Sequence, residues 1–397
     1  MRPDISFWRG DGVLASRPIV WLIGFFAFLN VYSMQSVLPM VMHDFEATPV
    51  EAGVTVGATV LAIALVSPFM GMLSDAFGRK VIICTSLFAM TVPTAFIPLV
   101  DSLQGLIALR FLQGLAVPGI VVVLIAYLSE EFHEGGVARM TAIYVGGTVM
   151  GGFFGRFMTG HAGHLLGWRG AYVTLAVLNL IGAILVLWLL PASKNFVSHR
   201  DLAGALQTLR QHLVNPRLLA VCAMGFCVLF SLVGTFTYVN LYLAEPPFNL
   251  TASGLANIFS VYLLGVMVTP VAGRFIVRFG FLRSVLGALS LSGAGLLLTL
   301  VPSLTVVILG LAVCSSGVFI CQSATISHIA ANVKEGRSLA TGIYYFSYYA
   351  GGAAGSWVAG LAYEGWNWGG SVVSIIVFQL LAVTIAVRYL KPKGVAS

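Results

Sequence analysis

Twelve runs of about 20 apolar residues recur along the chain, and they restrict its fold more than any other feature. A helix of this length can cross a bilayer because all of its backbone polar groups are bonded within the segment. The runs lie at 18–42, 50–73, 80–100, 104–129, 139–163, 169–191, 218–243, 252–276, 283–302, 304–331, 339–362 and 368–390. Because 58% of the residues are hydrophobic, the chain is predicted to be an all-α integral membrane protein of twelve transmembrane helices.

Basic residues divide unequally between the two sides of the predicted membrane. Of the 21 Lys and Arg residues, Arg169 falls in a loop on one side, Arg110 and Arg156 lie within runs, and the rest lie on the other side. Because cytoplasmic loops collect Lys and Arg, both termini are predicted to be cytoplasmic. This asymmetry explains the net charge of +7, so we expect membrane lipids and no nucleic acid as partners.

The sequence repeats itself at an offset of about 200 residues, which predicts two parallel six-helix halves. The repeated residues are Pro68, Gly71, Phe77 and Gly78 with Pro270, Gly273, Phe279 and Gly280, and Gly151, Gly152, Gly155 and Gly160 with Gly351, Gly352, Gly355 and Gly360. The predicted domains are an N-terminal segment at 1–17, a first half at 18–191, a central loop at 192–217, a second half at 218–390 and a tail at 391–397. The central loop has the periodicity of an amphipathic helix on the membrane surface.

The stretch GMLSDAFGRK at 71–80 concentrates charge in one predicted cytoplasmic turn. Gly71 and Gly78 allow a tight reversal, Asp75 can stabilise the N-terminus of a neighbouring helix, and Arg79 can reach a carboxylate. We call this predicted set of breakable contacts the latch. Lys80 either belongs to the latch or is one of the basic residues that mark the cytoplasmic side.

This stretch resembles the signature that the major facilitator superfamily carries between helices 2 and 3. The resemblance implies a transporter in which Asp75 caps a helix of the other half and Arg79 pairs with Glu130 or Glu131. RFLQG at 110–114 is similar to a second family motif, whose arginine is linked to ion coupling.

By the same resemblance, the chain looks like bacterial inner-membrane efflux proteins for drugs or sugars. That implies proton-coupled efflux of drugs, sugars or metabolites through the cell inner membrane by alternating access. GGTVMGGFFGR at 146–156 is similar to the helix-5 motif of drug:proton antiporters, but Gly152 replaces its proline and Arg156 its final glycine.

Two arginines inside apolar runs favour an alternative function. Arg110 and Arg156 lie in the outer half of their runs, Gln113 shares a helical face with Arg110, and no Asp or Glu lies deep in any run. Guanidinium groups bind carboxylates or phosphates in bidentate fashion, so the alternative is a carrier for an organic anion. Either arginine could instead bond to backbone carbonyls. A non-transporting receptor on the same fold is a second alternative.

The remaining candidates are polar or aromatic residues of a substrate cavity and glycines that let helices pack closely. The cavity candidates are Asn30, Gln35, Tyr238, Asn240, Gln322, Tyr345 and Tyr348. The packing glycines are Gly147, Gly151, Gly155, Gly351 and Gly355. No catalytic or metal-binding motif is present, so we expect a monomeric carrier of a small molecule, without enzymatic activity, cofactor or metal.

Overall fold

The computed structural model describes residues 12–132, 134–193, 202–264, 267, 278–333 and 337–390, and its regular elements are all helices. In order they are α1 Gly12–Leu29, η2 Ser33–Val37, α2 Leu38–Asp44, α3 Pro49–Phe77, α4 Arg79–Phe96, η3 Ile97–Leu99, α5 Leu103–Glu131, α6 Glu134–Leu189, α7 Leu202–Leu213, α8 Pro216–Ala244, α9 Ala252–Ile258, α11 Phe281–Leu298, α12 Leu304–Asn332 and α13 Arg337–Tyr389.

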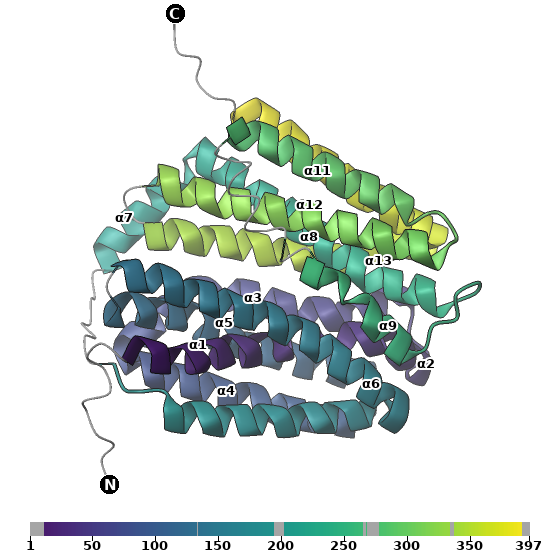
Figure 1. Cartoon of the computed structure of the whole chain (residues 1–397), viewed down its shortest axis with the longest axis horizontal. Helices are drawn as coiled ribbons and strands as arrows, with labels where there is room; N and C mark the ends of the chain where they lie inside the picture. Colours follow the sequence, from purple (N-terminus) through teal and green to yellow (C-terminus); the bar gives the residue numbers. More distant parts are fainter. Residues whose placement is uncertain are drawn as a thin grey trace, which may run out of the picture.

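Two of these helices are too long for a single crossing, and each contains a break. A straight helix of 56 residues, the length of α6, would extend roughly 84 Å, whereas the hydrocarbon core is about 30 Å thick. The backbone leaves helical geometry at Gly167 in α6 and at Trp366 and Asn367 in α13. Figure 1 shows α6 reversing direction, so each long helix holds two of the expected runs.

The first run differs from the expected single helix at 18–42. Two segments, Arg17–Leu29 and Ser33–Asp44, meet at an angle of 45°. Residues 30–32 form the turn between them, and the carbonyls of Asn30 and Val31 accept hydrogen bonds from the side chain of Arg110. The carbonyls at the break therefore accept from a charged donor on another helix, and that of Asn30 also accepts from Ser33.

The described part of the chain holds eight helices long and apolar enough to cross a membrane, or nine with the bent pair. Each expected run coincides with one of these helices or with half of α6 or α13, except 252–276, which extends into residues outside the described ranges. The repeat partners Pro270 and Gly273 also lie outside them. The twelve-span count, the domain boundaries and the cytoplasmic termini stay predictions.

The helices form two layers that face each other across the middle of the molecule. In Figure 1 the purple to blue helices α1 and α3 to α6 make up one layer, and the green to yellow helices α8 and α11 to α13 make up the other. We call the described chain from α1 to α6 the N half and that from α8 to α13 the C half, so that η2 and α2 belong to the N half and α9 and the residues after it to the C half. The end with the 71–80 turn is called the inner end, and the opposite end, with the Gly167 break, is called the outer end.

Glycine packing repeats between the two halves. A Cβ on Gly151 or Gly155 would collide with the carbonyl oxygens of Phe25 or Leu29 in α1. In the C half, Gly351 and Gly355 lie equally close to the carbonyls of two α8 residues, Phe226 and Phe230. The repeated glycines thus let backbone meet backbone at the same helix pair in each half.

Candidate transport site

The charged turn at the inner end is held together by Arg79. Gly78 has φ +92°, which suits glycine and reverses the chain between α3 and α4. The buried Arg79 donates from Nε and Nη2 to Glu130 at the end of α5, with the shortest contact at 2.6 Å. Its Nη1 donates to Ser74, so the turn is fastened to two helices of its own half.

Asp75 also contacts Arg79, at 2.6 Å, and therefore stays within the N half. The resemblance instead implies that this carboxylate caps a helix of the C half. Glu131 follows Glu130 at the helix end, Lys80 is partly buried, and a Cβ on Gly71 would meet open space. The structure thus places the latch residues together without showing the contact between halves.

Arg110 is completely buried, and its donors are taken up by protein acceptors. Nε donates to the carbonyl of Thr55 at 3.2 Å, and Nη2 donates to Val31 at 2.7 Å. Nη1 donates to the Asn30 carbonyl at 2.9 Å and to Gln113 at 2.7 Å. An anion at Arg110 would have to displace these bonds, so the geometry favours the backbone-carbonyl alternative for this arginine.

Arg156 is buried too, but its surroundings differ. Nε donates to Oε1 of Gln35 at 2.8 Å and Nη1 to the carbonyl of Gly152 at 2.7 Å. Nη2 makes no hydrogen bond to the described residues, and no Asp or Glu among them pairs with Arg156. Because Nη2 is unused and 3% of the residue stays exposed, the guanidinium can donate to a further acceptor.

Three aromatic rings surround the guanidinium of Arg156. Its Cζ lies 4.6 Å from the ring centre of Tyr32, 4.8 Å from Phe259 and 4.7 Å from Tyr262. These distances are within the range of cation–π attraction. We call these three rings the aromatic cage. Tyr32 belongs to the N half, whereas Phe259 and Tyr262 follow α9 in the C half and contact Phe236 of α8, so both halves contribute to the cage.

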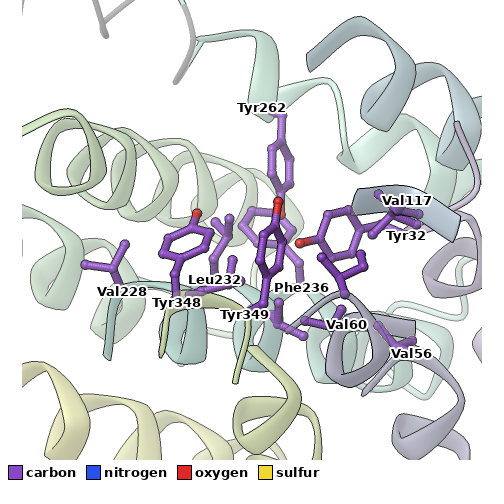
Figure 2. Packing of buried hydrophobic residues seen from close by; sticks show 14 of the residues in the cluster. Tyr32, Val56, Val60, Val117, Val228, Leu232, Phe236, Tyr262, Tyr348 and Tyr349 are labelled. Atoms are coloured by element: carbon purple, nitrogen blue, oxygen red, sulfur yellow. The ribbon is translucent and has the colours of Figure 1, made fainter. Parts of the chain in front are cut away.

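Four tyrosines with free hydroxyls lie around this position. Figure 2 shows Tyr32, Tyr262 and Tyr349 turning their hydroxyls toward one another, with Tyr348 beside them. None of the four hydroxyls bonds to a described residue, and the residues keep 4–8% of their surface exposed. Arg156 and these hydroxyls together form the candidate transport site.

The other predicted cavity residues have different surroundings. Tyr238 of α8 donates to the carbonyl of Ser356 in α13 and so joins two helices of the C half, whereas Asn240 donates at 2.5 Å to the carbonyl of Phe236 within α8. Gln322 is partly buried in α12. The side chain of Asn30 is buried, and neither of its amide atoms bonds to a described residue.

Tyr345 instead belongs to the aromatic cluster, with its ring 6.5 Å from Tyr348 and 6.2 Å from Tyr349. It therefore extends the aromatic surface next to the candidate transport site.

Contacts between the halves close the outer end. The backbone N–H of Val50 donates to Glu364 at 3.1 Å, and the His161 ring bonds to Asn257 at 3.1 Å. A Cβ on Gly160 would collide with Ala256 across the same seam. Beyond this seal a cleft of about 690 Å³ opens outward, with Asp44 and Arg169 among its lining residues.

Comparison with known proteins decides the family. The model of the Major Facilitator Superfamily matches residues 20–330. The chain belongs to this superfamily. An uncharacterized transporter of Buchnera aphidicola subsp. Schizaphis graminum is 31% identical over 98% of this chain and 96% of its own length. The MFS-type transporter YybF of Bacillus subtilis is 31% identical over 92% and 91%, respectively.

Solved structures of superfamily transporters share the fold. A bacterial homologue of the human lysosomal transporter Spinster, inward-facing and occupied, has a TM-score of 0.78 at 17% identity, covering 97% of this chain and 98% of its own. The xylose transporter XylE of E. coli, partially occluded and inward-open, has a TM-score of 0.74 at 14% identity, covering 95% and 98%. These structures show the shared fold, while the family match and the transporter-named relatives identify the chain as a multi-pass membrane transporter.

Proposed function

We propose that this transporter is a secondary carrier of a small organic anion, which binds Arg156 in the outer half of the membrane-spanning helices. The observation that carries the proposal is the buried guanidinium with an unused Nη2 and no carboxylate partner among the described residues. A charge within a membrane span is costly, so an unpaired one marks a pathway. A bound carboxylate would supply the missing countercharge through charge-assisted hydrogen bonds.

The contacts support alternating access between two halves. The outer end is sealed by bonds such as that between Val50 and Glu364, while at the inner end the ion pair of Asp75 among the described residues is with Arg79 of its own half. This combination is what an inward-facing carrier requires. We infer that the site loads from the inner end, and that closure there brings Asp75 to the C half.

Proton-coupled efflux of drugs or sugars is the competing proposal. Proton coupling needs a titratable group in the pathway, and no Asp or Glu of the described helices pairs with Arg156. The geometry therefore favours the anion carrier. The basic loops support cytoplasmic termini, and the bacterial relatives support a place in a bacterial inner membrane; we keep the monomer as a prediction.

Thermal stability of the detergent-purified protein tests the choice between substrate classes. A ligand at 100 times its Kd stabilises a protein by about 2.7 kcal/mol. We expect stabilisation by members of a panel of carboxylates, sulfonates and organic phosphates, and none by lipophilic cations or neutral sugars.

The matched variants are Arg156→Gln, which should lose the anion response, and Arg169→Gln, which removes a half-buried arginine already paired with Asp44 and should keep it. Stabilisation by cations or sugars alone, or an anion response that persists in Arg156→Gln, would contradict the anion carrier.

A further inference from the structure

A chain of polar contacts runs from Arg156 across the boundary between the two halves. Arg156 donates to Oε1 of Gln35 at 2.8 Å, and Nε2 of Gln35 donates to Oγ1 of Thr237 at 3.0 Å. Gln35 and Arg156 belong to the N half, and Thr237 lies in α8 of the C half. All three side chains are buried, at 1%, 3% and 0% exposure.

One amide group makes both contacts. The Gln35 oxygen accepts from the arginine while its nitrogen donates across the boundary, so a single orientation of the planar amide satisfies both. A carboxylate that binds the unused Nη2 and, in bidentate fashion, the adjacent Nε takes Arg156 away from the Gln35 oxygen and removes one of the two bonds that fix this orientation. The bond to Thr237 then loses its support.

The aromatic cage crosses the boundary in the same direction. Phe259 and Tyr262, from the C half, place their rings within 4.8 Å of the Arg156 Cζ. Ring faces attract a cation, and this attraction weakens when a bound anion compensates the charge. The hydrogen bonds of Gln35 and the ring contacts therefore hold the halves together most strongly when no anion is bound to Arg156.

We propose that Gln35 and Thr237 are positioning residues that connect occupancy of Arg156 to closure of the outer end. With the site empty, the contacts hold the halves together; an anion at Arg156 competes for the guanidinium and releases them. The anion step rests on the proposed function, whereas the closure by Gln35 and Thr237 does not. By linkage, an anion that favours the open outer end binds more tightly when that end is open.

We call the connection from Arg156 through Gln35 to Thr237 the relay. Pairwise distances between spin labels at the outer end test it. Labels at Leu165 of the N half and Trp366 of the C half are suitable, because these residues are 79% and 76% exposed. The native cysteines of the described helices are buried. Pulsed electron–electron double resonance then measures the distance between the two labels, and so the fraction of molecules with separated outer ends, in the full-length protein without added ligand.

Three variants give three different expectations. Thr237→Val keeps the shape but removes the acceptor, so we expect the separated fraction to rise about 3- to 10-fold, as loss of one hydrogen bond allows. Thr237→Ser keeps the hydroxyl and should match the parent. Gln35→Glu puts a carboxylate beside Arg156 that can also accept from the Thr237 hydroxyl, so the separated fraction should fall below the parent.

The opposite shifts of Thr237→Val and Gln35→Glu distinguish a relay from general damage, since destabilisation would not strengthen closure. Equal distributions for Thr237→Val and Thr237→Ser, or a Gln35→Glu variant as open as Thr237→Val, would overturn the relay.

Sodium benzoate, compared with sodium chloride at the same ionic strength, tests the anion step. It should raise the separated fraction in the parent and leave Arg156→Gln unchanged. An unmoved parent would overturn the coupling to anions, while the variant shifts would still establish the closure itself. Persistent anion binding in the stability assay with unmoved variants would instead leave the proposed function standing and remove the relay.

Discussion

Arg110 and Arg156 are both buried arginines in apolar helices, yet their bonds give them different roles. Arg110 has acceptors for Nε and both terminal nitrogens, on three carbonyls and Gln113. Arg156 bonds to one amide oxygen and one carbonyl, and otherwise faces aromatic rings. The first arrangement compensates a bent helix, and the second leaves room for a ligand.

Replacing Arg110 should therefore harm stability more than replacing Arg156. Arg110→Lys keeps the charge but not the fork of donors, and we expect about 1–3 kcal/mol lost for each buried carbonyl left without a donor. The thermal unfolding temperature in detergent measures this loss. Arg156→Lys is the matched control and should lose less, because fewer of its bonds go to protein. Equal losses would show that the two arginines are equivalent.

The sequence points to these arginines because a charge stands out in an apolar run, but it could not sort their roles. The role of Arg110 depends on the backbone carbonyls of Asn30 and Val31, about 80 positions away in the sequence. The hydrophobic pattern of the sequence does not reveal such contacts. Thr237, Phe259 and Tyr262 were not among the predicted site residues. Threonine and aromatic residues are common in membrane helices, so only their spatial arrangement identifies them.

At the scale of elements, repeated glycines were the most informative sequence signal. Their positions predict close helix contacts, and the structure shows α6 against α1 and α13 against α8 at corresponding points. The break at residues 30–32 had no such signal, because neither Gly nor Pro stands there. The side chain of Arg110, which comes from another helix, donates to the carbonyls of Asn30 and Val31 at this break.

The glycine packing predicts a sharp difference between two positions on α6. A Cβ on Gly151 would collide with the Phe25 carbonyl, whereas one on Gly146 meets nothing within 4 Å. We expect Gly151→Ala to cost about 1–3 kcal/mol through overpacking, and Gly146→Ala to be neutral or stabilising. Unfolding temperatures of the two variants give the comparison. A tolerated alanine at 151 would contradict the close approach.

At the scale of the whole molecule, the two ends of the carrier are held by different devices. The outer end is closed through α6, α8, α9 and α13, and the inner turn keeps Asp75 and Arg79 within the N half. The sequence predicts the halves and the turn from repetition and charge. It cannot predict which end is closed, because that depends on small energy differences between two arrangements of the same contacts.

Asp75→Asn should shift the balance toward the open inner end. Its carboxylate can stabilise a helix N-terminus of the C half when that end closes, a contact worth about 0.3–2 kcal/mol, or roughly 2- to 30-fold in population. Loss of the pair with Arg79 has a smaller effect, because Arg79 keeps its bonds to Glu130 and Ser74. Label distances at the inner end measure the shift, with Ala76→Asn as the control. An unchanged distribution would argue against the latch.

The most direct test of alternating access is to measure both ends under the same conditions. One label pair reports the outer end, at Leu165 and Trp366, and a second reports the inner end, at Ser129 and Asn332, all four residues being exposed. The account predicts two populations, in which conditions that separate the outer pair bring the inner pair together. Ends that open together, or a single fixed distance at each end under all conditions, would contradict it.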